Sequence, residues 1–436
     1  MTNPRTLIIS YAYNPAMNPR SFRWSTLAEY WAKQGHQVSV ISSWKPSLPR
    51  YELLNGVNIY RVGGAITEVL RSQLRSSDNI SSISHDKFTL NTPRLQPASL
   101  VKLIHDYTWK QVYWPDCSCL WYFPVLKKVK QLLSTQKYDN LISVSEPFTG
   151  HLVGLSVKKK FPEITWIIDI GDPFCFIENR PPNNHNLYKK LNYSAERNVF
   201  KNADSISVTT KPTLEKYVAL FPESSMKIHL IPPLLSLSTT IYPENLIFPK
   251  DGKIRFVFVG TLYSKMRNPD LLLHLFQKLL HTHIGDKLEL HFFGKINDCY
   301  QDFAPYKILI GTKIFCHGLV SHSQAYKAMK EANILVNIGN KSPYELPSKV
   351  VEYTSFGKPV LNIAKIEKDT SMEFFNAYPA SLCLLESGET WDSDHVDKLV
   401  QFIEKQPHLE RTQLQQWLAP YQIESIAAKY EVLLKN

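Results

Sequence analysis

The chain has 436 residues, 44% hydrophobic and 20% charged, which is typical of a globular protein with two domains and excludes a disordered one. No apolar run approaches the roughly 20 residues of a membrane span, and the first residues lead into a strand rather than a signal peptide, so we expect a cytoplasmic protein. The six cysteines show no CxxC pair and no zinc-ligand spacing, which predicts reduced thiols and no metal site.

The net charge of +11 is concentrated in the first half of the chain. Residues 1–245 carry 28 Lys and Arg against 18 Asp and Glu, whereas residues 246–436 carry 22 against 21. Such a basic half suits an anionic partner, which could be nucleic acid, an acidic membrane surface or a phosphorylated lipid. A charge that serves only solubility is the alternative.

The chain opens with a predicted strand at 6–11, a helix from about 21 to 33 and a second strand at 36–41. This order predicts a parallel sheet. The loop after the first strand lacks GxGxxG, so we expect no dinucleotide fingerprint there. Arg20 and Arg23, at the start of the helix, are candidates for binding an anion, although either could simply be a solvated residue of the first turn.

Periodicity fades after a strand at 57–61, and we interpret residues 63 to about 98 as a surface excursion. The next segment, 98–114, reads as an amphipathic helix that carries aromatic residues and two lysines. It could lie on a membrane, but an aromatic stripe at helical spacing is more often part of a core, which we favour.

Two predicted strands deliver polar residues at their carboxyl ends, where ligands bind in open α/β sheets. The strand at 138–145 leads to His151, and the strand at 165–170 leads to Asp172. Either could have a local role, His151 at a helix start and Asp172 in a turn. Their position on neighbouring strand ends makes them candidates for a site.

A second domain begins with a predicted strand at 254–259, followed by Gly260 and a basic loop. Gly260 allows close approach of a ligand to the backbone, and Arg267 can reach a diphosphate from the loop, unless the loop is merely solvated. Helices are expected at 269–280 and 321–331. Beyond residue 388 the chain reads as helical, and 417–434 could cross back onto the first domain.

The most informative stretch, 344–363, joins two short apolar runs through a loop and a short helix. If Pro347 is the first helical residue, Ser348 and Lys349 lie at the helix N-terminus and favour phosphate. Glu352 shares the face of Lys349 and can accept hydrogen bonds from vicinal hydroxyls. Together these groups suit a nucleoside diphosphate. An ordinary strand, helix and strand with a surface Lys and Glu is the alternative.

Several short motifs follow one another along the chain. They are Ser21-Phe-Arg-Trp24 with Gly35-His36, Trp114-Pro-Asp116 with Trp121, Ser143-Val-Ser-Glu-Pro-Phe-Thr-Gly-His151, Ile168-Asp-Ile-Gly-Asp-Pro-Phe174, Gly260-Thr-Leu-Tyr263 with Arg267, Leu346-Pro-Ser-Lys-Val-Val-Glu-Tyr353 and Gly357-Lys-Pro-Val360. In residues and order they resemble the GT-B glycosyltransferases, specifically the glycosyltransferase 4-like enzymes of bacterial surface polysaccharide synthesis. The resemblance covers most of the chain outside 63–112.

This resemblance implies an α/β protein of GT-B architecture, with two Rossmann-like domains whose parallel sheets face across a cleft. The expected domains are 1–240 on the acceptor side, 241–415 for the nucleotide sugar, and a C-terminal helix, 416–436, that returns to the first domain. By resemblance Glu352 binds the ribose, while Arg267, Ser348 and Lys349 bind the diphosphate. His151 and Asp172 correspond to catalytic positions near the transferred sugar.

The sequence departs from the family pattern at three positions. The first glutamate of a paired-glutamate motif falls at Tyr344, with Glu345 one place later. Thr261 stands where an Arg often follows the glycine of the second domain, and Gly171 replaces an Arg before Asp172. The donor-binding set is therefore expected to be Gly260, Thr261, Arg267, Glu345, Ser348, Lys349 and Glu352.

The implied reaction is transfer of a sugar from a nucleotide sugar to a glycan or lipid-linked acceptor, with retention of anomeric configuration and without metal or cofactor. The basic first domain would suit peripheral contact with the inner face of the plasma membrane. A nucleotide-sugar epimerase of the same fold and a non-catalytic partner subunit are alternatives. A nucleic-acid-binding protein is disfavoured, because charge is its only support.

Overall fold

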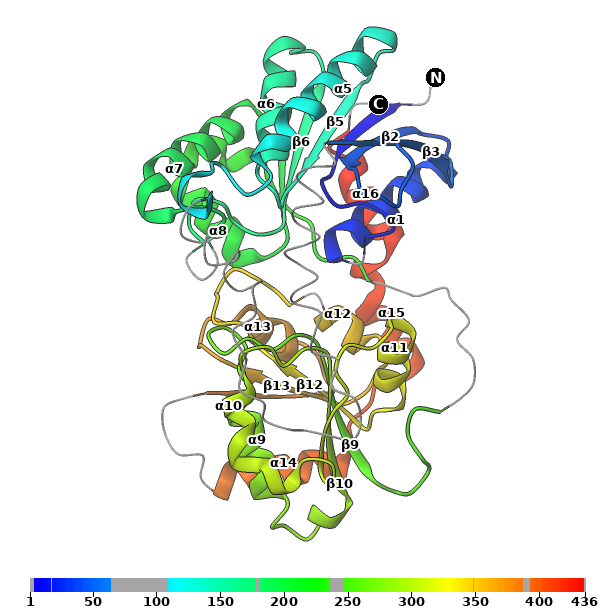
Figure 1. Cartoon of the computed structure of the whole chain (residues 1–436). Helices are drawn as coiled ribbons and strands as arrows, with labels where there is room; N and C mark the ends of the chain where they lie inside the picture. The colour runs from blue at the N-terminus through cyan, green and yellow to red at the C-terminus, as the bar shows by residue number, and fades with distance from the viewer. Residues whose placement is uncertain are drawn as a thin grey trace. The chain divides into compact units, whose positions relative to one another are not determined.

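The computed structural model describes residues 4–16, 18–63, 109–177, 181–235, 246–347, 349–386 and 393–434. These residues form two compact units (Figure 1). Unit 1 contains 4–63, 109–234 and 421–434, and unit 2 contains 235 and 246–420. Each unit is described by itself.

Unit 1 is built on a sheet of eight strands in the order β3-β4-β2-β1-β5-β6-β7-β8. All neighbours are parallel except β3 and β4, which form a hairpin. Asn55 and Gly56 make the hairpin turn with φ of 50° and 83°, the left-handed values that such tight turns need. The strands are β1 (Arg5–Ile9), β2 (Gln37–Ser43), β3 (Tyr51–Leu54), β4 (Val57–Val62), β5 (Asn140–Val144), β6 (Thr165–Ile170), β7 (Ser205–Val208) and β8 (Ile228–Leu230).

Helices supply the apolar side chains that pack on this sheet in two clusters. One cluster joins the sheet to α5, α6, α7 and α8, and the other joins it to α1 and α16. The helices of unit 1 are α1 (Pro19–Lys33), α4 (Trp109–Val112), η2 (Cys119–Trp121), α5 (Tyr122–Thr135), α6 (Thr149–Lys160), α7 (His185–Asn202), α8 (Lys211–Leu220), η3 (Pro222–Lys227) and α16 (Ile423–Glu431).

The C-terminal helix α16 belongs to unit 1 although it follows the whole of unit 2 in sequence. It lies beside α1, as the red and blue helices show in Figure 1. The ring of Tyr430 packs edge-on against Trp24 and Trp31 at 5.2 and 6.2 Å. The indole Nε1 of Trp31 donates to Glu431 Oε1 at 3.1 Å. The returning helix is therefore held by both apolar and polar contacts.

Unit 2 contains a parallel sheet of six strands in the order β11-β10-β9-β12-β13-β14. The strands are β9 (Ile254–Val259), β10 (Leu288–Phe293), β11 (Ile314–Cys316), β12 (Ile334–Ile338), β13 (Val360–Ala364) and β14 (Ser381–Leu385). Its helices are α9 (Asp270–Leu279), η4 (Gly285–Lys287), α10 (Tyr300–Phe303), η5 (Ala304–Leu309), α11 (His322–Glu331), α12 (Lys349–Thr354), α13 (Thr370–Asn376), α14 (Ser393–Lys405), α15 (Arg411–Leu418) and η6 (Ala419–Tyr421).

The expected α/β architecture with two largely parallel sheets is confirmed, but some elements differ from the sequence prediction. The helix expected at 417–434 is divided, because α15 ends at Leu418 and α16 begins at Ile423. Strands β3 and β14 were not predicted. The excursion expected at 63–112 lies mostly outside the described residues. Within the described part of the chain, no helix has the length and apolar content needed to cross a bilayer.

Candidate functional site

In unit 2 the strand order reverses between β9 and β12, and such a reversal is where ligands bind in open α/β sheets. β9 ends at Val259, and the N–H of the next residue, Gly260, donates to the carbonyl of Phe293 at 2.9 Å. A Cβ on Gly260 would lie 3.6 Å from Arg267 Nη1, and one on Gly294 would lie 1.8 Å from the Gly260 carbonyl. Glycine is thus needed at 294, just after β10 ends, because a side chain there would collide with the Gly260 backbone. At Gly260 the absence of a side chain leaves the backbone open beside Arg267.

Arg267 lies on the loop after β9, as the sequence predicted. Its Nε and Nη2 donate to Asn340 Oδ1 at 3.2 and 2.7 Å. Asn340 is buried in the loop after β12, so the guanidinium joins the two loops at the point where the strand order reverses. Thr261, next to Gly260, is partly buried.

Helix α12 is fixed to the end of β9 by Tyr353. Its hydroxyl accepts from the Val259 N–H at 2.8 Å and donates to the Val259 carbonyl at 3.0 Å. A fully buried tyrosine that binds both backbone groups of one strand residue leaves the helix little freedom. The neighbouring residues of α12 are therefore held close to Gly260.

Glu352 on α12 is the most informative residue of unit 2. Its side chain is buried, and Oε2 accepts from Lys349 Nζ. The other oxygen, Oε1, is buried without a hydrogen-bond partner among the described residues, and His322 Nε2 lies 4.0 Å from it. An unsatisfied buried carboxylate oxygen costs on the order of 1–3 kcal/mol or more. Such an oxygen is therefore suited to a ligand hydroxyl.

The remaining predicted donor residues lie along the segment before α12. The helix begins at Lys349, so Pro347 precedes it instead of being its first residue as expected. Ser348 lies outside the described residues. Glu345 is partly buried, and its backbone carbonyl accepts from Thr370 Oγ1 at 2.7 Å. This bond ties the segment to α13.

In unit 1 the structure places His151 inside α6, with only 1% of its surface exposed. Ser143 Oγ lies 2.8 Å from His151 Nδ1 and accepts from Trp166 Nε1 at 2.9 Å. We assign the serine hydroxyl hydrogen to the bond with Nδ1, because it has no other acceptor among the described residues, and this assignment places the ring hydrogen on Nε2. Nε2 is buried and has no partner among the described residues. Burial lowers the pKa of His151 to about 3. The ring is therefore a neutral donor.

Asp116, the last residue of the Trp114-Pro-Asp116 motif, binds the start of α6. Asp116 is buried, and its carboxylate accepts from the Thr149 N–H at 2.8 Å and from Thr149 Oγ1 at 2.9 Å. A carboxylate at a helix N-terminus accepts a hydrogen bond from a free N–H and interacts favourably with the positive end of the helix dipole. Asp116 thus positions the helix that carries His151.

Asp172 lies in the loop after β6 and is partly exposed. Its carboxylate has no hydrogen-bond or ion-pair partner within the described part of the chain. The loop around it is well held, because Glu196 accepts from the Phe174 and Cys175 N–H groups at 3.3 and 2.9 Å. The Phe174 ring also stacks on Phe148 at 3.8 Å. The free carboxylate is therefore presented by a rigid loop.

Arg23 does not fit the anion-binding role expected from the sequence. It is buried, with Nη1 donating to the Pro232 carbonyl at 2.7 Å. Nη2 donates to Tyr430 hydroxyl at 3.0 Å and to the Ile231 carbonyl at 3.4 Å. Its donors are thus used to fasten α1, the end of β8 and α16. Arg20, by contrast, is partly exposed, with its Nη1 3.4 Å from Asp169 Oδ2.

Asp169 and Glu196 were not identified as functional candidates from the sequence. Burial acts to raise the pKa of Asp169, but Arg20, Arg23 and hydrogen bonds outweigh it and hold the pKa below its ordinary value. Burial raises the pKa of Glu196. An acidic residue inside an apolar strand was the available signal for Asp169. Glu196 gave a weaker signal, because its helix is largely polar.

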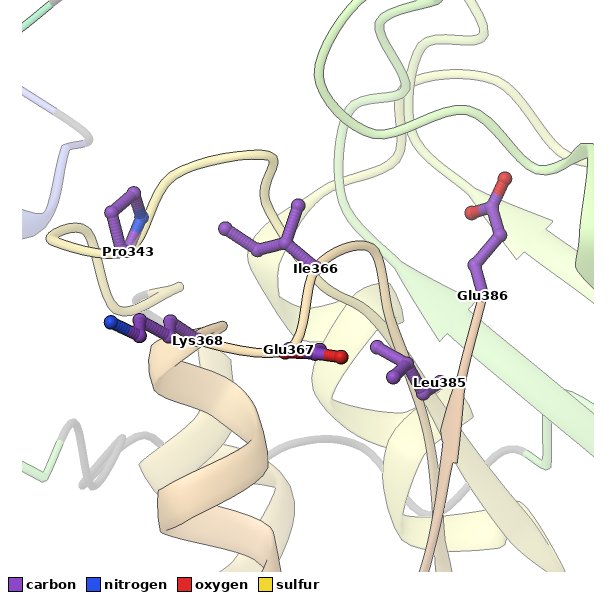
Figure 2. Close-up of a pocket in the computed structure, with 6 residues that line it drawn as sticks. All are labelled: Pro343, Ile366, Glu367, Lys368, Leu385 and Glu386. Atoms are coloured by element: carbon purple, nitrogen blue, oxygen red, sulfur yellow. The ribbon is translucent and has the colours of Figure 1, made fainter. Parts of the chain in front are cut away.

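A separate hollow of about 510 Å³ lies at the carboxyl ends of β13 and β14 (Figure 2). It is lined by Pro343, Ile366, Glu367, Lys368, Leu385 and Glu386. None of the predicted donor-binding residues belongs to this lining. Among the described residues, no group of three or more His, Cys, Asp or Glu side chains could hold a metal ion.

Solved structures with the same fold are glycosyltransferases of the GT-B type. A glycosyltransferase from Rickettsia africae matches with a TM-score of 0.59 and 14% identity, over 99% of this chain and 98% of that one. WaaG, involved in lipopolysaccharide biosynthesis, matches with a TM-score of 0.55 and 12% identity, over 99% and 100%. A trehalose-phosphate synthase from Burkholderia xenovorans, solved with glucose-6-phosphate, matches with a TM-score of 0.60 and 10% identity, over 99% and 100%.

No family model and no curated protein matches the sequence. The structural likeness extends over nearly the whole length of both partners in each pair. At these identities it establishes the fold. The chain therefore has the GT-B fold, and its activity must be argued from its own residues.

Proposed function

We propose that the protein is a glycosyltransferase that moves a sugar from a nucleotide-sugar donor to a glycan or lipid-linked acceptor. The observation that carries the proposal is the buried Oε1 of Glu352, which has no hydrogen-bond partner among the described residues and lies beside Lys349 near the end of β9. A vicinal diol, such as that of a ribose, would supply the missing donor. Arg267, at the point where the strand order reverses, would then bind the attached diphosphate.

The proposed donor site lies in unit 2 and uses cations to stabilise the leaving group. When the sugar bond breaks, negative charge develops on the departing diphosphate. Arg267 and Lys349 would stabilise this charge without a metal ion, and the bare backbone at Gly260 would let the diphosphate approach. Thr261, Glu345 and Ser348 complete the proposed donor-binding set.

We assign the acceptor to unit 1. Within the part of the chain that the structure describes, neither the Nε2–H assigned to His151 nor the partly exposed carboxylate of Asp172 has a hydrogen-bond partner. The histidine would donate to a sugar oxygen, and Asp172 would orient the attacking hydroxyl. We further propose that transfer retains the anomeric configuration and serves cell-surface polysaccharide synthesis, on the basis of the motif resemblance.

Unit 1 also carries a surface suited to an anionic membrane. Leu120 and Phe123, three residues apart around the start of α5, expose 50% and 69% of their surface. Lys127 and Lys130, both exposed, follow Phe123 at helical spacing on α5. Apolar side chains next to lysines bind interfaces by burying the former and pairing the latter with lipid phosphate. We propose that this surface, named the α5 surface, brings the protein to a lipid-linked acceptor at the cytoplasmic membrane face.

The donor site can be tested by calorimetric titration with UDP, GDP and ADP. Wild-type protein should bind one of them selectively. Glu352→Ala and Arg267→Ala should each weaken binding roughly 10- to 150-fold, because a hydrogen bond to a charged group contributes about 1.5–3 kcal/mol. Matched controls are Glu373→Ala and Lys287→Ala, which remove an exposed carboxylate and an exposed lysine from unit 2.

Absence of binding to every nucleotide would contradict the proposal and favour a non-catalytic protein of this fold. Equal losses of nucleotide affinity in the site variants and their controls would instead show that affinity depends on the overall charge of the protein and not on this site. Selective binding that both site variants lose would also identify the base of the donor.

A further inference from the structure

The side chain of Arg20 occupies the space in which a side chain at position 171 would lie. A Cβ built on Gly171 would be 1.5 Å from Arg20 Nη2, 1.9 Å from Cζ and 2.1 Å from Nε. Real Cβ atoms do not approach other atoms so closely. The guanidinium therefore lies directly on the Gly171 backbone, at the end of β6, and is present there only because residue 171 is glycine.

Most N–H groups of the Arg20 guanidinium have no acceptor in the described part of the chain. It can donate five hydrogen bonds, yet the only one in the described part of the chain is the long contact of Nη1 with Asp169 Oδ2 at 3.4 Å. Its side chain is 21% exposed. A partly exposed guanidinium that is held in place with most of its N–H groups free is suited to a planar oxyanion, which it can bind in a bidentate manner.

The accessible positive charge of this region belongs to Arg20. Asp169 is buried and is shared between Arg20 and Arg23. Arg23 is buried and bound to backbone carbonyls, so it offers no charge to a ligand. Asp172, which follows Gly171, balances the sum of these charges, so a ligand must keep its anionic group at Arg20 and away from Asp172.

Asp169 is itself fixed and acts as a positioning residue for Arg20. Its Oδ1 accepts from Ser207 Oγ at 2.6 Å and from the Tyr430 hydroxyl at 2.7 Å. Its Oδ2 accepts from Trp24 Nε1 at 2.9 Å. These three hydrogen bonds fix the orientation of the carboxylate. Asp169 therefore positions the guanidinium of Arg20 through a single long contact and leaves the other N–H donors of Arg20 available.

We propose that the acceptor of the transfer reaction carries an oxyanion, a phosphate or a carboxylate, and that Arg20 binds it next to Asp172. This inference rests on the proposed function, because it names the class of acceptor for the site in unit 1. The free carboxylate of Asp172 follows Gly171 directly and would repel the same oxyanion. The acceptor therefore places its hydroxyl at Asp172 and its anionic group at Arg20.

The test compares three sugars of similar size in calorimetric titrations of the full chain: glucose 6-phosphate, glucuronate and glucose. A background that carries both Arg267→Ala and Lys349→Ala removes the two cations of the proposed donor site from the comparison. At least one anionic sugar should bind more tightly than glucose. Arg20→Gln should weaken that binding about tenfold or more, and Arg20→Lys should retain part of it.

Two further variants separate a binding role from a structural one. Gly171→Ala keeps every charge but displaces the guanidinium, so it should reduce anion affinity as strongly as Arg20→Gln. Arg197→Gln removes an exposed arginine of α7 and should leave the affinity unchanged. If Arg20 only braced Asp169, both Arg20→Gln and Gly171→Ala would lower stability and leave anion affinity at the wild-type value, which would overturn the inference.

The two proposals fail in different ways. Nucleotide titration of Arg20→Gln, in the otherwise wild-type chain, should give the wild-type affinity, because Arg20 lies in unit 1. Nucleotide binding without any anion binding that depends on Arg20 would overturn this inference alone. Arg20-dependent anion binding without nucleotide binding would overturn the proposed donor site and, with it, the assignment of the anion to an acceptor. The phosphate and carboxylate sugars show which oxyanion the site prefers.

Discussion

Replacement of Tyr430 by phenylalanine should destabilise unit 1 much more than the loss of one hydroxyl group suggests. The hydroxyl donates to Asp169 Oδ1 at 2.7 Å and accepts from Arg23 Nη2 at 3.0 Å. Both partners are charged and buried. Since a hydrogen bond to a charged group contributes about 1.5–3 kcal/mol, removal of the two bonds should cost roughly 3 kcal/mol. The aromatic packing against Trp24 and Trp31 is retained.

The assay is urea denaturation of the full chain, followed by tryptophan fluorescence. Tyr430→Phe should lower the midpoint of the transition that reports Trp24 and Trp31, without a large change in slope. Tyr51→Phe is the control, because its hydroxyl donates to Asn58 Oδ1 in an exposed, neutral bond. It should change the free energy of unfolding by less than about 0.5 kcal/mol. Equal midpoints for Tyr430→Phe and wild type would refute the view that α16 is held by this polar network.

Two further predictions concern His151 and the α5 surface. Burial lowers the pKa of His151 from 6.5 to about 3. The stability that depends on the neutral ring is therefore fully present above pH 6.5 and decreases as the pH falls toward 3. Between pH 6.5 and 5, the free energy of unfolding should fall by about 1 kcal/mol per pH unit more in wild type than in His151→Gln. Parallel curves for the two proteins would show that the ring is not buried as a neutral group. Phe123→Ser should reduce binding to vesicles rich in phosphatidylglycerol about tenfold, because burying a Phe contributes about 1.5–3 kcal/mol, whereas Ile308→Ser, an exposed apolar residue of unit 2, should not. Equal binding by all three proteins would contradict the membrane assignment.

The parts of the site that the sequence predicted are local in the chain. Lys349 and Glu352 are three residues apart on one short helix, so helical spacing alone placed them together. Gly260 and Arg267 follow the same strand. The alternation of strands and helices also predicted largely parallel sheets. The exception is the run β2, β3 and β4, which has no helix between its strands and contains the antiparallel pair.

The parts that the sequence did not predict depend on contacts between distant segments. Arg23 looked like a residue of a free helix N-terminus, but its partners, Ile231 and Tyr430, come from the end of β8 and from α16. Likewise, the sequence shows only that Gly171 stands where the family pattern has an Arg before Asp172. Only the structure shows that Arg20, 151 positions earlier, takes the vacant space.

A double-mutant cycle shows whether Glu352 binds the ribose of a nucleotide donor. The preferred nucleoside diphosphate and its 2′,3′-dideoxy analogue are titrated into wild type and Glu352→Ala. Wild type should bind the analogue about tenfold or more weakly than the parent nucleotide, whereas the variant should bind both nucleotides equally. The same loss in both proteins would show that Glu352 does not contact the ribose, and the proposed donor site would be wrong.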